Sequence, residues 1–208
     1  AELPFCDFGE VIDPPSADVT AHVVEMLAEL DADAMGFPID RDAMNRGVQW
    51  LSDEQEEDGS WYGRWGANYL YGTGAVVPAL ISAGVPAHDN RVVRACRWLE
   101  SVQNQDGGWG EDMRSYVDDN WRGRGESTPS QTAWALLALV AAGRSSEEAA
   151  QRGVAWLVEH QRDDGDWDEP WYTGTGFSGD FYIRYHLYRL VFPLMALGRW
   201  VQATTGEG

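Results

Sequence analysis

The chain has 208 residues, of which 44% are apolar and 24% charged, so its composition is that of a folded globular protein and not of a disordered segment. Its 34 acidic and 15 basic residues give a formal net charge of −19, which argues against binding to nucleic acid or to anionic lipid. Cys6 and Cys96 lie far apart and show no metal-ligand spacing, so free thiols in the cytoplasm are expected.

Apolar residues recur at helical spacing along the chain and no strand-like alternation stands out, so the sequence predicts an all-α fold built from helix pairs. Pro193 is expected to bend the last helix. Four helices are expected in addition to those of the repeated segments, and in chain order they are 18–30, 74–83, 130–142 and 179–200. Ser16 is expected to cap the first of them, and 128–131 is the start signal of the third.

Three segments share one pattern, in which an Arg, a Trp-Leu pair and a Gln precede an Asp-Gly turn that closes on a second Trp. These segments are 46–61, 94–109 and 152–167. Each is typical of a helix that stops at a Gly-containing turn, and a second helix fits in the gap that follows. Helix pairs that repeat at this interval along the chain indicate a solenoid or a closed α/α toroid, and the spacing alone does not distinguish these two architectures.

The Trp residues that close the three segments are interpreted as structural. They are Trp61, Trp109 and Trp167. An indole N–H needs a hydrogen-bond partner when it is buried. We expect each indole to stack near the Gln of its own segment and to tie successive helices together.

The order of Arg, Trp-Leu, Gln and Gly-x-Trp resembles the QW repeat of the triterpene cyclases. The segment 58–72 resembles that family's signature, apart from Ala67, where a bulkier apolar residue is usual. The tail 174–189 resembles the end of the bacterial squalene–hopene cyclases, and so do the stretches 4–10 and 18–22. The resemblance covers almost the whole chain, and it implies the C-terminal part of a catalytic α/α barrel that converts squalene to a pentacyclic product, hopene or hopanol.

The resemblance also implies that the chain lacks the acid of the reaction. In the family, the proton donor is the middle Asp of an Asp-x-Asp-Asp motif, upstream of the part that matches 3–10. The pair Asp31 and Asp33 lacks the third Asp and is typical of a solvated acidic turn. The isolated chain is therefore expected to be inactive, with the N-terminal part of a cyclase as its partner. The complete enzyme is expected to be cytoplasmic and peripheral on the membrane.

Polyene cyclisation carries a carbocation through successive ring closures, so it needs a dry cavity lined by aromatic faces that stabilise positive charge. Phe177, Phe181, Tyr185 and Tyr188 step by four, four and three residues, so on a helix they would share one face. From spacing alone, a core stripe is favoured. The resemblance instead implies that they line the cavity, together with Trp65 and Tyr71.

Asp18 and His22 are four residues apart and are expected to pair on one helical face. A lone His beside an Asp is more often structural than catalytic. The resemblance implies that His22 bonds the absent catalytic Asp and raises its acidity, since an imidazolium favours ionisation of a neighbouring acid. It also implies that Phe5 and Cys6 form the constriction through which substrate enters.

No metal and no cofactor is expected. The run 118–120 does not continue as the metal-binding motif of ionisation-type terpene synthases, and 163–168 lacks the spacing of a calcium loop. Two other functions stay open. One is a stand-alone toroid that binds isoprenoid lipid without turnover, and the other is a prenyltransferase β-like subunit, which would need zinc. Homodimerisation over helix faces that an incomplete toroid exposes is a further expectation.

Overall fold

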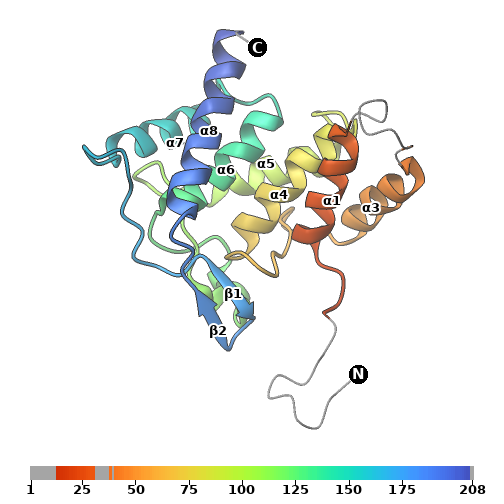
Figure 1. Cartoon of the computed structure of the whole chain (residues 1–208), viewed down its shortest axis with the longest axis horizontal. Coiled ribbons are helices and arrows are strands. Elements are labelled where there is room, and N and C mark those ends of the chain that lie inside the picture. The colour runs from red at the N-terminus through yellow and green to blue at the C-terminus, as the bar shows by residue number, and fades with distance from the viewer. Residues whose placement is uncertain (1–12, 31–37, 39, 207–208) are drawn as a thin grey trace.

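The computed structural model describes residues 13–30, 38 and 40–206, and its architecture is all-α with one small hairpin (Figure 1). The elements are α1 (Ala17–Glu29), α3 (Arg41–Asp53), α4 (Tyr69–Ser82), α5 (Asn90–Ser101), η1 (Met113–Tyr116), η2 (Asp119–Trp121), α6 (Pro129–Ala141), α7 (Glu148–Glu159), β1 (Gly174–Phe177), β2 (Phe181–Ile183) and α8 (Tyr188–Thr205). None of the helices in these ranges is long and apolar enough to cross a membrane.

The helices form two layers, as a segment of an α/α toroid does. The inner layer is the row α1, α4, α6 and α8, in which each helix packs on the next (Figure 1). The outer helices α3, α5 and α7 pack on α1, α4 and α6 in turn. Both α4 and α6 are buried along nearly their whole length, because they are apolar on all sides and lie between two inner neighbours and an outer helix.

The predicted helix boundaries hold at two of the inner helices. The first helix begins one residue before the predicted Asp18, and α6 begins one residue before the predicted Ser130. Thr128 caps α6, since its side chain accepts a hydrogen bond from the Gln131 N–H. Ser16 occupies the cap position of α1, but its side chain makes no cap hydrogen bond. Helix α4 begins at Tyr69, well before the predicted start at Gly74.

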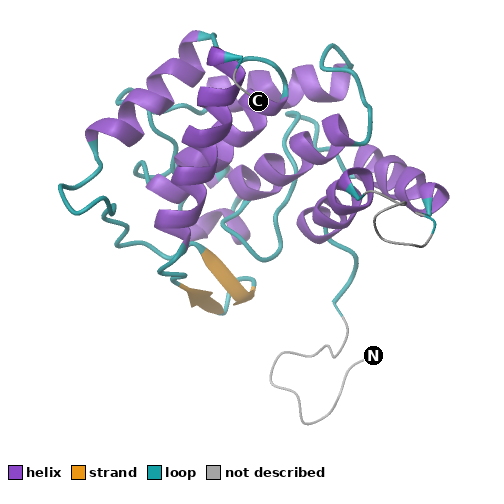
Figure 2. Ribbon diagram, turned by 45° about the horizontal axis from the view of Figure 1, so that its top comes forward, coloured by secondary structure: helices purple, strands orange, loops and turns teal. Residues whose placement is uncertain are grey.

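The prediction of one helix over 179–200 is wrong. Its first part instead holds the turn and the second strand of the antiparallel hairpin β1–β2, which lies at one end of the inner layer (Figure 2), and α8 starts only at Tyr188. Gly179 makes the turn with a φ of 88°, a conformation that favours glycine over other residues. The glycines of this stretch lower its helical propensity, while Thr175 and Ile183 suit a strand.

The closing Trp residues tie the layers together by the same contacts in successive segments. Each indole N–H donates to the carbonyl of the Leu ten residues earlier, at 2.7 to 2.8 Å. The backbone N–H groups of Trp61 and Trp109 donate to the Oγ1 atoms of Thr73 and Thr132 on the next inner helix, each at 3.0 Å. All three indoles are fully buried, which agrees with a structural role.

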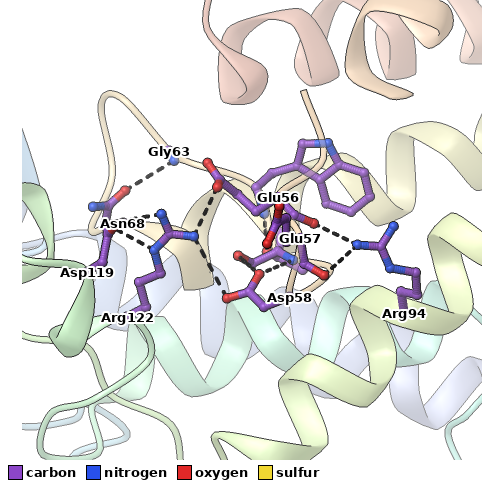
Figure 3. Close-up of polar contacts among 11 residues, drawn as sticks. Glu56, Glu57, Asp58, Gly63, Asn68, Arg94, Asp119 and Arg122 are labelled. Carbon is purple, nitrogen blue, oxygen red and sulfur yellow. Dashed lines mark hydrogen bonds and ion pairs between the residues drawn. The ribbon is translucent and has the colours of Figure 1, made fainter. Parts of the chain in front are cut away.

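A clamp between Arg and Gln joins neighbouring outer helices. Arg94 at α5 donates to Gln55 Oε1 and to the carbonyls of Glu56 and Glu57, as Figure 3 shows for the two carbonyls. Gln55 in return donates to the Arg91 carbonyl at 2.9 Å. The second clamp repeats these contacts between α5 and α7, with Arg152 donating to Gln103, Asn104 and Gln105.

Among the described residues, the Arg at the first end of the outer layer and the Gln turn at the last end have no clamp partner. Arg46 stands where Arg94 stands in the next segment, yet it contacts no Gln turn among the described residues. Gln161 bonds the Gly165 carbonyl of its own turn, and no described outer helix covers that turn. A Cβ at Gly165 would meet nothing within 4 Å, whereas one at Gly59 would lie 2.8 Å from Arg94.

Replacing Trp109 with Ala is expected to lower the free energy of unfolding by about 3–5 kcal/mol, because it empties a buried site and removes the bond to the Leu99 carbonyl. Chemical denaturation measures the difference. Trp171→Ala is the control, since the Trp171 side chain is half exposed and its loss should cost well under 1 kcal/mol. Equal losses in the two variants would contradict the structural role of Trp109.

Candidate functional site

A continuous row of aromatic rings crosses the inner layer from α1 to α8. The Nε2 atom of His22 on α1 lies 3.1 Å from the Tyr71 hydroxyl on α4. The Tyr71 ring meets the Trp134 ring of α6 edge-on, with centroids 4.8 Å apart. The Trp134 ring meets Tyr188, at the start of α8, edge-on at 6.0 Å. Tyr185 stacks on Tyr188 at 4.6 Å. These five residues form what we call the aromatic wall.

The structure therefore brings His22, Tyr71, Tyr185 and Tyr188 together, but not by the predicted route. The prediction that the aromatic residues of 177–188 share one face of a helix is wrong, because the hairpin occupies part of this stretch. Phe177 lies on β1 and Phe181 on β2, while Tyr185 follows the hairpin and Tyr188 begins α8. The two Phe side chains are 36% and 53% exposed. Phe5 and Cys6 lie outside the described residues.

The expected pair between Asp18 and His22 is also not formed. The Asp18 carboxylate is buried, and it accepts from the Val19 N–H at 3.0 Å and from the Trp65 N–H at 2.8 Å. Spacing of four residues allowed a contact, but the two donors satisfy the carboxylate and His22 turns to Tyr71 instead. Asp18 thus fixes the backbone of Trp65.

The segment 63–70, which carries Trp65 and leads into Tyr71, is anchored from several elements. In addition to the Asp18 bond, the Trp65 carbonyl accepts from Thr175 and the Ala67 N–H donates to the Thr173 carbonyl, so the hairpin side of the chain holds it. Within the segment, Asn68 Oδ1 accepts from the Gly63 N–H (Figure 3). The Trp65 ring itself remains 36% exposed. Its backbone is fixed, and the Arg64 guanidinium lies over the ring, 4.7 Å from the ring centroid.

A second set of hydrogen bonds, from three further side chains, holds the same segment. The Glu111 carboxylate accepts from the Asn68 N–H at 3.4 Å and the Leu70 N–H at 2.8 Å. The Tyr116 hydroxyl donates to the Gly66 carbonyl at 2.6 Å, and Gln131 donates to the Ala67 carbonyl at 3.3 Å. We call Glu111, Tyr116 and Gln131 the rear support. None of the three was singled out from the sequence.

Burial shapes the electrostatics of this region. Burial raises the pKa of Tyr71 above its ordinary value, so its hydroxyl stays neutral and can share a hydrogen bond with His22. Burial also raises the pKa of Glu111, although hydrogen bonds from the Leu70 backbone and the Ser115 side chain act in the opposite direction. Its Oε1 atom has no partner among the described residues, whereas Oε2 accepts both N–H groups.

The raised pKa of Glu111 predicts a stability that falls as the pH rises. Below the ordinary carboxyl pKa the group is protonated in both states. As the pH rises, the unfolded chain ionises first, so the folded state loses stability relative to a neutral side chain. Glu111→Gln should therefore become more stable relative to the natural protein as the pH is raised from about 4, where an ordinary carboxyl group ionises, to neutral. Thermal unfolding over that range measures it, and a gap that does not change with pH would contradict the prediction.

Two cavities flank the site. One of about 140 Å³ is lined by the wall residues His22, Tyr71 and Trp134, together with Phe192 of α8. A larger one of about 620 Å³ lies behind, against Glu111 and Gln131, and none of the predicted site residues lines it. We assign the site to the aromatic wall itself, of which His22, Tyr71 and Trp134 line the smaller cavity and Tyr185 and Tyr188 do not. Among the described residues, no three His, Cys, Asp or Glu side chains gather in a way that could hold a metal ion.

The fold and the site define a segment of an α/α toroid with an aromatic wall and a histidine at one end of it. The chain belongs to the squalene–hopene cyclase C-terminal domain family, whose model matches residues 1–202. The chain is 62% identical over 201 residues to the squalene–hopene cyclase of Alicyclobacillus acidocaldarius, and it is 49% identical over 199 residues to that of Schizosaccharomyces japonicus. It is 40% identical over 196 residues to the sporulenol synthase of Bacillus subtilis.

These matches cover 97%, 96% and 94% of the chain but only 31%, 30% and 30% of the relatives, so the chain spans about a third of their length. Among solved structures, ent-copalyl diphosphate synthase from Streptomyces platensis matches with a TM-score of 0.61 at 25% identity. That match covers 94% of this chain and 34% of that one. A second solved protein, from Actinoplanes, has the same TM-score at 22% identity and supports the fold alone.

Proposed function

We propose that this chain is the C-terminal part of a squalene–hopene cyclase, an isomerase that protonates squalene and closes its rings to a pentacyclic triterpene. The observation that carries the proposal is the aromatic wall with His22 at its end, found in a chain that is 62% identical to a protein named squalene–hopene cyclase. In this function the chain supplies the cavity wall and the orienting histidine. The proton donor comes from the N-terminal part.

The residues of the wall have separate tasks in the proposed reaction. The initiating acid protonates the terminal alkene, and electrons of each double bond then close the next ring until a proton is lost from the final cation. His22 would bond the donor and favour its ionisation, while Tyr71 fixes the His22 ring. The exposed part of the Tyr185 ring, and that of the Trp65 ring beside Arg64, would stabilise cations as they form, because the face of an aromatic ring is electron-rich.

The apolar faces of the two end helices support the proposal that an N-terminal part packs here. Val19, Val23 and Met26 of α1 are each nearly half exposed. On α8, Val191 is 46% and Leu194 58% exposed. Apolar patches of this kind mark interaction surfaces. Together with the open clamps at both ends of the outer layer, they fit further helices of the same toroid. The complete protein would lie at the cytoplasmic side of the membrane, where its water-insoluble substrate is found.

The test compares the full-length natural polypeptide with this chain alone, each incubated with squalene and extracted for gas chromatography and mass spectrometry. Cyclised triterpenes from the full-length protein, and none from the isolated chain, would support the proposal. If the full-length natural polypeptide binds squalene without turnover, the alternative of a non-catalytic lipid-binding toroid is favoured. Light scattering on the isolated chain shows whether its open faces pair two copies into a dimer.

A further inference from the structure

We propose that Glu111 is a positioning residue of this site, whose carboxylate holds the segment 63–70 and thereby sets the position of Trp65 and, in the aromatic wall, of Tyr71. The inference rests on the proposed cyclase function and adds a residue that contacts no substrate. It starts from the two N–H groups that Glu111 Oε2 accepts, one at Asn68 and one at Leu70. These flank the first residue of α4, so one buried atom fixes both the loop and the helix start.

The repeat pattern shows what is general in this contact. Glu111 and Glu169 each follow a closing Trp by two residues. Glu169 bonds the Ser130 N–H at 3.0 Å and the Ser130 hydroxyl at 2.7 Å, so it too reaches back to the start of the preceding inner helix. A buried Glu therefore caps the previous inner helix in the second and third segments, whereas the first segment has Gly63 in its place.

The surroundings of Glu111 distinguish it from a simple helix cap. Its own N–H donates to Gln131 Oε1 and its carbonyl accepts from Gln131 Nε2, each at 3.0 Å, and the same amide then reaches the Ala67 carbonyl. Asn68 Nδ2 donates to Ser115 Oγ, one residue before Tyr116, which holds Gly66. Because the whole rear support converges on 66–70, removing the carboxylate loosens the segment that carries the two rings.

A looser segment has a defined chemical consequence. A cation is stabilised by an aromatic face only at short range and in the right orientation, so a displaced ring lets the cation lose a proton before all rings have closed. Removing the Glu111 carboxylate should therefore raise the share of incompletely cyclised products. Glu111→Gln should not, because an amide oxygen can replace Oε2 as the acceptor of the Asn68 and Leu70 N–H groups.

The experiment uses the full-length polypeptide with Glu111→Met, Glu111→Gln and, as the control, Arg152→Ala. The control removes three hydrogen bonds from the outer layer, away from the segment. Two readouts are taken well below each melting temperature. They are hydrogen exchange of peptides covering 63–72, followed by mass spectrometry, and the ratio of incompletely to fully cyclised products from squalene. If Glu111→Met does not fold, Glu111→Asp, whose shorter side chain withdraws the carboxylate, takes its place.

We expect exchange in 63–72 to rise at least tenfold and the product ratio to shift at least threefold in Glu111→Met, with both near natural values in Glu111→Gln and Arg152→Ala. Unchanged exchange would overturn the proposal, whatever the activity. Faster exchange with an unchanged product ratio would also overturn it, since Glu111 would then be only structural. A natural protein that makes no cyclised product would instead refute the proposed function, and the exchange result would still report on the segment.

Discussion

Replacing His22 with Ala is expected to slow squalene cyclisation by about 10²-fold or more while leaving the ratio of products unchanged. The reason is that His22 stands at one end of the aromatic wall and would act on the initiating acid and not on the later cations. Its ring is 3.1 Å from the Tyr71 hydroxyl, which fixes its orientation. Initial rates with the full-length protein, together with product analysis, measure both quantities.

His160 provides the matched control for His22. It stacks on Trp156 of the outer helix α7, with ring centroids 4.1 Å apart, and lies in the outer layer. We expect His160→Ala to keep the natural rate to within about twofold. A natural rate in His22→Ala would remove His22 from the mechanism. A normal rate with altered products would mean that His22 acts on a cation and not on the acid.

Replacing Tyr185 with Ala is expected to divert most of the product to incompletely cyclised triterpenes, with a smaller loss of overall rate. Tyr185 ends the aromatic wall, its ring stacks on Tyr188, and it is 37% exposed, so its free face is open to a substrate. A cation that loses this face is less stabilised, by about 2 kcal/mol where the site is dry, and competing proton loss then wins. Trp65→Ala should act in the same direction, and Tyr185→Phe should keep the natural products.

Tyr172 is the matched control for Tyr185. It lies in the loop before the hairpin, is 54% exposed, and lines the larger cavity behind the site. Tyr172→Ala should leave the product distribution unchanged. An unchanged distribution in both Tyr185→Ala and Trp65→Ala would mean that the aromatic wall does not contact the reacting chain, and the site would have to be placed elsewhere.

The parts of the fold that the sequence predicted well are those that depend on local signals. The first helix follows from its apolar spacing, and α6 from Thr128 and Pro129 at its start. The repeated Asp-Gly-x-Trp turns indicated helix pairs, because each turn separates an outer helix from the next inner one, and its glycine has a positive φ, as Gly59 does with a φ of 100°. The outer helix itself ends before the turn, as α3 does at Asp53. Resemblance to a family, and not spacing, supplied His22 and the other site residues.

The remaining features depend on contacts between residues far apart in the chain. His22 and Tyr71 are separated by 49 positions and meet only because α1 packs on α4. The spacing of Phe177, Phe181 and Tyr185 fits a helix, yet a hairpin with a bulge between Thr175 and Phe177 also places aromatic residues at such intervals. Glu111 left one signal, the Glu that follows Trp by two residues in the second and third segments. Its partners could be known only from the structure.

The measurement that tests the central claim most directly is cyclisation of squalene by the full-length protein in heavy water, read by mass spectrometry of the products. Proton-initiated cyclisation adds one solvent-exchanged hydrogen at the first double bond. We therefore predict that the cyclised hydrocarbon carries one deuterium and is one mass unit heavier than the product made in ordinary water. Squalene recovered unchanged, or a cyclised product without deuterium, would contradict the account.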